Sequence, residues 1–241
     1  MAEKTARVVR IETVAPDMLL VACRMVDPPA LPFRAGQFLS LRLGDDGKVR
    51  RSYSLASSPA RQDGFDLLVK VVPGGVGSDW FLALAPGRDL HFTGPMGFFV
   101  CDLAHAGDVV FAATGAGIAP VVPMIEEILA RPGEAGRVLL YWGLRREADV
   151  FFADRLAAFA ARSPRCAWHV CLSRASTEWA GVNGRLTQHV LTALPRLDRP
   201  VFYLCGNGSM IRDLKQGLVD LGVDRKRQIR AEVFYPASEP R

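Results

Sequence analysis

The sequence predicts a two-domain fold, with an N-terminal antiparallel β-barrel followed by a C-terminal α/β domain that holds a mainly parallel sheet. Three observations predict it. Residues 5–99 form short alternating runs separated by turn signals, whereas from about residue 107 short apolar runs alternate with segments of helical period. The chain has 241 residues, enough for two domains that each bury a core. We expect the domains to cover residues 1–102 and 107–241.

The strands of the first half are short and amphipathic. Residues 6–25, ARVVRIETVAPDMLLVACRM, read as two strands joined by a turn at Ala15-Pro16-Asp17. Several short strands at this spacing favour a barrel. One short helix is expected around residues 78–84, with Ser78 as its N-cap. Two further runs alternate so that their apolar residues share one face: Leu39, Leu41 and Leu43 in residues 37–43, and Phe65, Leu67, Val69 and Val71 in residues 65–72.

The second half repeats a strand–helix cycle, which is typical of βαβ units. The first strand, DVVFAAT, is followed by a segment with an apolar stripe at helical spacing. The later strands are expected in RVLLYWG, CAWHVCL, VFYLCG and QIRAEVF, and the later helices over residues 148–161, 186–191 and 209–221. The residues of the first helical stripe are Ile118, Val121, Val122, Ile125 and Leu129.

The composition excludes several classes of protein. No apolar run approaches the roughly 20 residues that cross a bilayer, and the start has no apolar core of signal-peptide length. We therefore expect a cytoplasmic protein that does not enter a membrane. The net charge is +5, which is modestly basic, but no basic stripe with interleaved aromatic residues indicates nucleic-acid binding.

The cysteines indicate neither disulfides nor a metal site. There are 5, scattered along the chain, and no C-x-x-C pair occurs. The nearest neighbours, Cys166 and Cys171, are five residues apart in an expected strand, which places them on opposite faces. We expect no bound metal.

Two glycine-rich turns follow strands of the second half. In TGAGIAP, Thr114, Gly115 and Gly117 end a strand and open a helix, where free backbone N–H groups and the helix dipole suit a pyrophosphate. Pro120 stands where a third glycine would complete G-x-G-x-x-G, and a plain strand–helix junction is the alternative. In YLCGNGSMIRD, Cys205 and Gly206 form a second such junction at the same sheet edge. The alternative for Cys205 is a small buried apolar residue.

The stretch RRSYSLASSP, residues 50–59, is unusual for a half-buried strand. It holds two arginines and four serines around Tyr53 and Leu55. Taken alone, it reads as an edge strand whose serines face water.

These motifs together resemble the ferredoxin–NADP reductase family, two-domain oxidoreductases that bind a flavin and a pyridine nucleotide. RSYS resembles the flavin motif of the family and GPMGFF the end of its flavin domain. TGAGIAP resembles the nucleotide-pyrophosphate loop, CGNGSM the nicotinamide-side motif and AEVF the glutamate–x–aromatic ending. The five motifs occur in the family's order through both halves of the chain.

The resemblance implies roles for the residues of the first half. Arg51 would neutralise the flavin pyrophosphate, because a guanidinium fork fits phosphate oxygens. Tyr53 would lie against the isoalloxazine ring, and Ser54 would form a hydrogen bond near flavin N5. RSYSLASS resembles the members that bind FAD more than those that bind FMN.

Further flavin contacts follow from the same resemblance. Val69 and Lys70 match the strand that runs beside the flavin. Gly77 and Ser78 match a helix start directed at the pyrophosphate. The plain alternatives are a turn glycine and an N-cap serine.

The resemblance extends to the nicotinamide side. Glu232 would assist nicotinamide positioning and proton handling, and Phe234 would cover the flavin face where nicotinamide stacks. Here the chain continues with YPASEPR, so Tyr235 or the tail could cover that face instead. Ser173 and Arg174 match a loop that binds the 2′-phosphate of NADP, with Arg145 and Arg146 nearby.

The function implied is electron transfer between NADP(H) and a separate one-electron carrier, a ferredoxin or flavodoxin, through FAD. Hydride would pass between nicotinamide C4 and flavin N5, with Ser54, Cys205 and Glu232 setting the geometry. We expect a monomer. The alternatives are an NAD(P)H-dependent reductase of an oxygenase or of free flavin, and a non-catalytic flavoprotein subunit of a larger complex.

Overall fold

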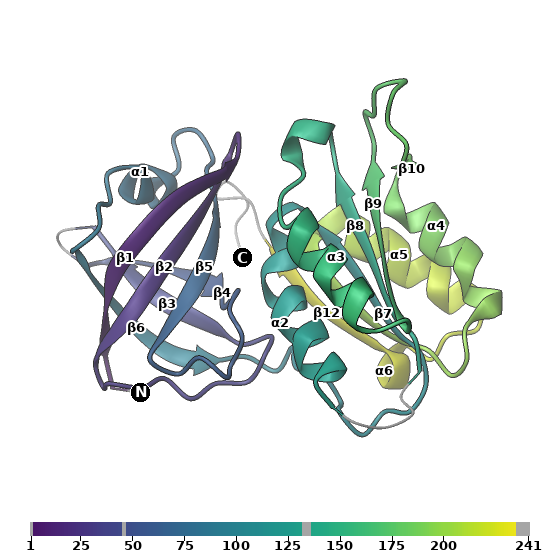
Figure 1. Cartoon of the computed structure of the whole chain (residues 1–241), viewed down its shortest axis with the longest axis horizontal. Helices are drawn as coiled ribbons and strands as arrows, with labels where there is room; N and C mark the ends of the chain where they lie inside the picture. Colours follow the sequence, from purple (N-terminus) through teal and green to yellow (C-terminus); the bar gives the residue numbers. More distant parts are fainter. Residues whose placement is uncertain (1, 45–46, 132–135, 235–241) are drawn as a thin grey trace.

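The chain folds into two domains that lie side by side, a barrel and an α/β domain (Figure 1). The structure is a computed structural model, and it describes residues 2–44, 47–131 and 136–234. The expected fold class is confirmed for both domains.

The first domain is a six-stranded antiparallel sheet in the order β4-β3-β6-β1-β2-β5. An antiparallel bridge between Leu55 and Leu67 brings the two ends of the sheet together and closes the barrel. The leucines predicted to share a face, Leu39, Leu41 and Leu43, are fully buried in the barrel core. The strands are β1 (Lys4–Ala15), β2 (Met18–Asp27), β3 (Phe38–Leu43), β4 (Val49–Ser54), β5 (Gly64–Lys70) and β6 (Asp89–Met96).

The helix of the barrel domain corrects one expectation. Helix α1 (Val76–Leu82) begins two residues earlier than predicted, and Gly75 is its N-cap. Ser78 lies inside the helix, where its Oγ accepts a hydrogen bond of 2.7 Å from the Val72 N–H. Ser78 therefore ties the preceding turn to the helix, a contact that an N-cap reading of the sequence did not include.

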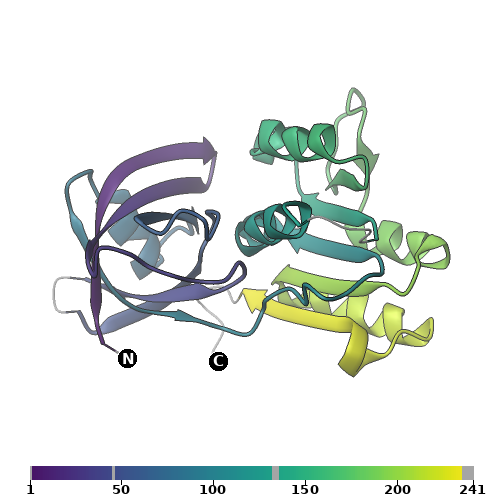
Figure 2. The same cartoon turned by 60° about the horizontal axis from the view of Figure 1, so that its bottom comes forward.

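The second domain is a six-stranded parallel sheet in the order β10-β9-β8-β7-β11-β12. Helices cover both faces of it (Figure 2). Cys166 and Cys171 belong to the cores on opposite faces, as predicted. The strands are β7 (Val109–Thr114), β8 (Val138–Leu144), β9 (Cys166–Leu172), β10 (Val182–Asn183), β11 (Val201–Asn207) and β12 (Ile229–Phe234). The helices are α2 (Ile118–Leu129), α3 (Ala153–Arg162), α4 (Leu186–Ala193), α5 (Gly208–Asp220) and α6 (Arg225–Gln228), with 3-10 turns η1 (Gly115–Gly117), η2 (Glu147–Asp149) and η3 (Leu194–Arg196).

Three elements differ from the sequence expectation. The helix predicted over residues 148–161 starts at Ala153, because Phe152 takes a left-handed φ of 59° that separates it from η2. The short strand β10 and the short helix α6 were not predicted. In α6, Asp224 acts as N-cap by accepting hydrogen bonds from the N–H groups of Lys226 and Arg227.

Helix α2 lies between the parallel sheet and the barrel. Residues 118–125 are all buried, so the helix has no exposed side along this stretch, which the predicted stripe did not anticipate. One apolar core continues from the sheet through α2 into the barrel, where it includes Met18, Ala35, Ala56 and Leu68. The two domains therefore share a packed interface.

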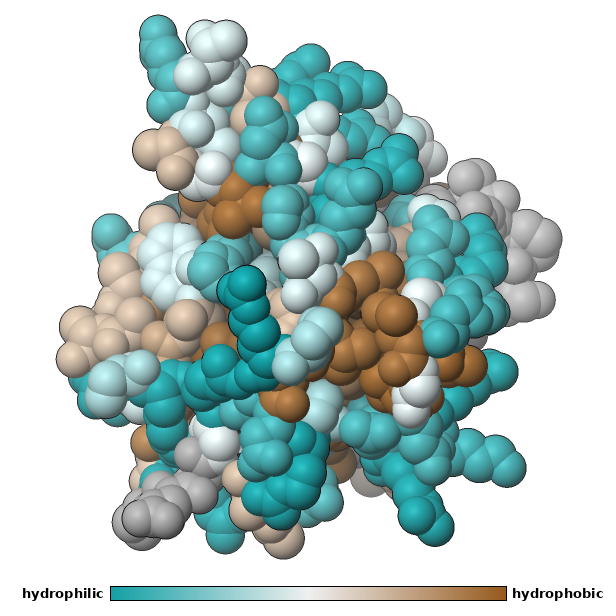
Figure 3. All heavy atoms as spheres, turned by 90° about the vertical axis from the view of Figure 1, so that its right-hand side faces the viewer, coloured by the Kyte–Doolittle hydropathy of each residue, from teal (hydrophilic) through white to brown (hydrophobic). Residues whose placement is uncertain are grey.

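Polar side chains dominate the face that the α/β domain turns away from the barrel, with apolar area across its middle (Figure 3). Among the residues that the structure describes, no helix is long and apolar enough to span a membrane.

Candidate functional site

The candidate site lies where the end of β4 meets β12. Ser54 ends β4 in the barrel, and its Oγ donates a hydrogen bond of 3.2 Å to Oε1 of Glu232 in β12. Cys205 is the register partner of Glu232 on the neighbouring strand β11. The structure thus brings together the three residues predicted to act on the nicotinamide side, although they come from both domains.

The side chains of the site are largely buried, and this burial shifts the pKa values of its titratable groups. Burial raises the pKa of Glu232, and the hydrogen bond from Ser54 opposes part of that rise. Burial, reinforced by the nearby Glu232 carboxylate, raises the pKa of the Cys205 thiol well above its usual value. Cys205 is fully buried and therefore stays a thiol, so it contributes shape and not nucleophilicity.

The two glycine turns pack against each other at the carboxyl edge of the sheet. A Cβ on Gly117 would lie 2.5 Å from the Cys205 carbonyl oxygen, and a Cβ on Gly206 would lie 2.3 Å from Thr114 Oγ1. Thr114 Oγ1 accepts a hydrogen bond of 2.8 Å from the Asn207 N–H. The glycines are required by this close approach, which joins the two motifs into one surface.

Gly115 differs from these two glycines. Its φ is +52°, and a Cβ there would meet nothing within 4 Å. Its carbonyl accepts a hydrogen bond of 3.1 Å from Trp142 Nε1, which holds the turn from the neighbouring strand β8. Sequence reasoning missed Trp142, because nothing in an apolar strand indicates which turn its indole reaches.

Asn207 was also missed. Its side chain caps α5 by accepting hydrogen bonds from the N–H groups of Ser209 and Met210. An asparagine directly before a helix is an N-cap signal, so this role was readable from the sequence.

On the barrel side, Gly77 lies close to the Tyr53 hydroxyl and near Arg51. A Cβ on Gly77 would lie 2.8 Å from the Tyr53 hydroxyl and 3.9 Å from Arg51 Cγ, so the packing leaves little room for a side chain at this position. The exposed Arg51 guanidinium donates only to the Arg50 carbonyl, and no carboxylate among the described residues pairs with it. An exposed arginine without a carboxylate partner suits a phosphate group.

Tyr53 is held in place by packing. Its ring meets Phe81 of α1 edge-on, with centroids 5.0 Å apart. Burial raises the pKa of Tyr53 to about 12, so the hydroxyl stays protonated and can donate a hydrogen bond.

Val69 and Lys70, predicted to belong to the strand beside the flavin, lie on β5. The Val69 side chain points into the barrel core and is 1% exposed, and Lys70 pairs with Asp17 at 3.0 Å. Strand β5, which carries both, runs beside the glycine turn η1.

The loops after β8 and β9 run together and carry the predicted phosphate-binding residues. The N–H of Ser173 donates to the Leu144 carbonyl, and the N–H of Arg174 donates to the Arg145 carbonyl. The side chains of Arg145 and Arg174 are exposed and have no ion-pair partner among the residues described. Two free guanidinium groups on neighbouring loops suit a phosphate monoester.

One acidic residue of these loops, Glu147, already has a hydrogen-bond partner. Glu147 Oε1 accepts a hydrogen bond of 2.7 Å from the Ser176 N–H, which lowers the pKa of Glu147. The carboxylate braces the loop pair.

Phe234 ends β12 opposite Asn207 and packs, half-buried, against the shared core. The predicted role of Tyr235 or the tail falls outside the described residues. Among the described residues, no group of three or more histidine, cysteine or acidic side chains is close enough to hold a metal ion.

Comparisons with known proteins identify both domains. The family model described as "Oxidoreductase FAD-binding domain" matches residues 5–101, and "Oxidoreductase NAD-binding domain" matches residues 111–216. Ferredoxin–NADP reductase B of Sorangium cellulosum is 35% identical over 235 residues, which cover 92% of this chain and 93% of the relative. The reductase component of phenol 2-monooxygenase from Pseudomonas is 34% identical over 87% of this chain, but this chain spans only 60% of its length.

Solved structures agree. The Amycolatopsis cytochrome P450 reductase GcoB is 31% identical with a TM-score of 0.90, over 98% of this chain and 71% of that one. A ferredoxin–NADP⁺ reductase from Neisseria gonorrhoeae, with bound FAD and NADP, shares the fold at a TM-score of 0.84 and 24% identity, over 97% of this chain and 99% of that one.

The fold and site define an oxidoreductase with one FAD-binding and one NAD-binding domain. The chain belongs to the ferredoxin–NADP reductase family.

Proposed function

We propose that this protein transfers electrons between NADP(H) and a separate one-electron carrier protein, a ferredoxin or flavodoxin. The observation that carries the proposal is the Ser54–Glu232 hydrogen bond, because it joins the FAD-binding barrel to the nucleotide-binding sheet directly beside Cys205. The Sorangium relative, which matches nearly end to end, is named a ferredoxin–NADP reductase. We propose domain limits of residues 1–102 and 107–241, and a monomer.

The barrel residues hold the flavin. Arg51 would neutralise the pyrophosphate, the backbone at Gly77 would approach it closely, and Tyr53 would pack against the ring system. Ser78 supports this site indirectly by bracing the turn before α1. FAD, when bound, supplies a centre that exchanges a hydride with nicotinamide and single electrons with a carrier.

The residues at the domain junction set the reacting geometry. Thr114, Gly115, Gly117 and Gly206 would form the backbone surface for the nucleotide pyrophosphate. Cys205 and the Ser54–Glu232 pair would enclose the nicotinamide and exclude water, and Glu232 would hold a proton at its carboxylate. Holding two reactants at attack distance is the main contribution a protein makes to this chemistry.

The loops after β8 and β9 favour NADP over NAD. Ser173 and Arg174 would contact the 2′-phosphate, with Arg145 from the adjoining loop completing the charge. Glu147 is hydrogen-bonded to backbone and does not compete for these arginines.

A reductase that serves an oxygenase is a second candidate. The phenol monooxygenase reductase and the P450 reductase GcoB carry such names, and this chain corresponds to 60% and 71% of their lengths. Phe234 would cover the flavin face in either kind of reductase, so it does not distinguish the two candidate functions.

The test is anaerobic stopped-flow reduction of the flavin-loaded protein with NADPH and NADH in parallel. Fast bleaching of flavin absorbance by NADPH and slow bleaching by NADH is the expected result. Fast bleaching by NADH with no preference for NADPH would favour the oxygenase reductase. Absence of bleaching by both would overturn the proposal.

A further inference from the structure

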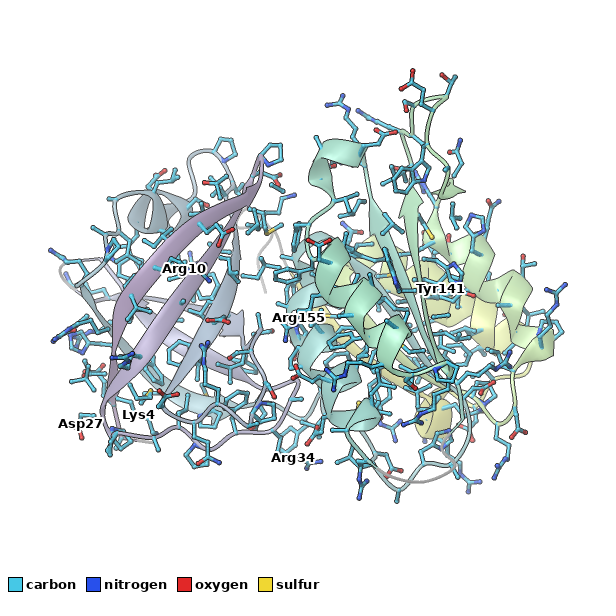
Figure 4. All side chains as sticks on the ribbon, viewed as in Figure 1. Lys4, Arg10, Asp27, Arg34, Tyr141 and Arg155 are labelled. Atoms are coloured by element: carbon cyan, nitrogen blue, oxygen red, sulfur yellow. The ribbon has the colours of Figure 1, made fainter. Side chains whose placement is uncertain are left out.

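A second polar bridge joins the two domains, away from the Ser54–Glu232 pair. Arg155 on α3 donates from Nη1 to the Ala56 carbonyl of the barrel at 3.2 Å, and from Nη2 to Oε2 of Glu126 on α2 at 3.1 Å. Figure 4 shows Arg155 at the junction of the domains. One guanidinium thus ties a barrel carbonyl to two helices of the nucleotide domain.

The barrel end of this bridge is only two residues from Ser54, and the segment between them is fixed. The Leu55 N–H donates to the Gln37 carbonyl at 3.0 Å, and the Ala56 N–H donates to the Asp66 carbonyl at 2.8 Å. Because hydrogen bonds hold this segment on both sides, a displacement of the Ala56 carbonyl also displaces Ser54.

The shared apolar core does not replace this bridge. Dispersion and burial hold the domains together, but they are non-directional and tolerate small sliding of one surface over another. Hydrogen bonds from a planar guanidinium are directional. The bond to the Ala56 carbonyl crosses between the domains and forms at one relative position of them, and the bond to Glu126, within the nucleotide domain, orients the guanidinium for it.

The ion pair of this bridge is partly exposed to water. The side chains of Arg155 and Glu126 are each 31% exposed, and they line a pocket of about 350 Å³ that Arg162 of the same helix also lines. Partly solvated ion pairs contribute little to stability. The bridge therefore acts mainly on the relative position of the domains and contributes little to stability.

We propose that Arg155 is a positioning residue for hydride transfer. It sets the distance between Ser54 on the flavin side and Glu232 and Cys205 on the nicotinamide side, without touching cofactor or substrate. This inference rests on the proposed function. A misplacement of about 1 Å far from the chemistry can slow a reaction by about 100-fold, so loss of the bridge should slow hydride transfer by roughly 5- to 20-fold.

The experiment is single-turnover reduction of FAD-loaded Arg155→Met by NADPH, over a range of NADPH concentrations. The limiting rate constant should fall by roughly 5- to 20-fold, while the NADPH concentration for half-saturation stays within about twofold. The kinetic deuterium isotope effect with NADPD should rise, because slower hydride transfer limits the observed rate more strongly. Arg155→Lys should recover part of the rate, because one ammonium can keep one of the two contacts.

Two further variants separate the explanations. Arg162→Met is the matched control, since Arg162 lines the same pocket but its side chain makes no hydrogen bond or ion pair within the described ranges, and it should behave as wild type. Glu126→Gln keeps the Arg155–Ala56 contact and should have the smaller effect.

An unchanged limiting rate in Arg155→Met would overturn the proposal. So would a lower melting temperature and flavin content with a normal rate per bound flavin, which would leave only a structural role. Failure of the proposed function looks different, because the wild type itself would then not be reduced by NADPH.

Discussion

Ser54 Oγ and Glu232 Oε1 lie 3.2 Å apart, although 178 residues separate them in the chain. The bond crosses from the barrel to the parallel sheet, so it forms only when both domains are folded and correctly docked. Any change that alters the docking should therefore be felt first at this pair.

Replacing Ser54 with alanine should slow flavin reduction by NADPH by roughly 10- to 100-fold, because the Glu232 carboxylate loses its donor and its fixed position. Stopped-flow reduction measures this, and flavin content should stay unchanged. Ser52→Ala, which changes an exposed serine of the same strand, is the control. A loss of less than twofold in Ser54→Ala would contradict the role.

Glu232→Gln should change how stability depends on pH. Burial raises the pKa of Glu232 above its usual 4.5, so at pH values between 4.5 and the raised pKa the folded protein holds a proton that the unfolded chain releases. Stability from this group is therefore lost as pH rises from about 4.5 through the raised pKa. Urea unfolding should show the variant more stable than wild type at pH 7.5 and equal to it near pH 4.

The control for this experiment is Glu178→Gln, which changes an exposed carboxylate in a loop. It should track the wild type at both pH values. A Glu232→Gln variant that is less stable than wild type at pH 7.5 would show that the carboxylate is stabilising, contrary to the expectation.

Arg174→Ala should raise the KM for NADPH by roughly 10- to 100-fold, since a charge-assisted contact to phosphate contributes on the order of 1.5–3 kcal/mol. The KM for NADH, which lacks the 2′-phosphate, should change by less than about twofold. Steady-state kinetics with both nucleotides measure the split. Arg24→Ala, on the barrel strand β2, is the control. Equal effects on both nucleotides would remove Arg174 from the phosphate site.

Gly117→Ala should destabilise the protein by about 1–3 kcal/mol, because its Cβ would sit 2.5 Å from the Cys205 carbonyl oxygen in a packed junction. Urea unfolding measures the loss. Gly208→Ala is matched, since its Cβ would meet only Val233 Cγ1, at 3.3 Å, and should cost no more than about 0.5 kcal/mol. Equal losses in the two variants would show that the close approach is not the cause.

Phe234→Ser should ease stacking of nicotinamide in the site. The variant should show roughly twofold or more charge-transfer absorbance on titration with NADP, because a smaller side chain leaves more of the ring face free. A titration curve that matches the wild type would indicate that another part of the chain covers this face.

Individual elements differ in how much of their packing could be predicted from the sequence. The leucine alternation predicted the buried face of β3, and the spacing of Cys166 and Cys171 predicted their opposite faces, because period 2 is a property of the strand itself. The stripe in α2 predicted the face toward the sheet. The burial of its other side was not predictable, because the barrel that covers it is folded from a separate part of the sequence.

The contacts of individual side chains were likewise predictable only where they are local in the chain. Asn207 as a helix cap was readable, since a cap acts within three residues. The choice of Ser78 as N-cap was wrong by a short distance, because Gly75 starts the helix and Ser78 instead serves the turn behind it. The Trp142 contact to Gly115 had no local signal.

The two-domain order, the barrel and parallel-sheet classes and the glycine junctions could all be predicted from the residues alone, because hydrophobic period and turn chemistry act over a few neighbouring residues. The tertiary structure alone decided that Ser54 meets Glu232, that Gly117 must pass the Cys205 carbonyl, and that Arg155 spans both domains. These contacts join residues far apart in the chain, and their geometry depends on how two completed cores pack together.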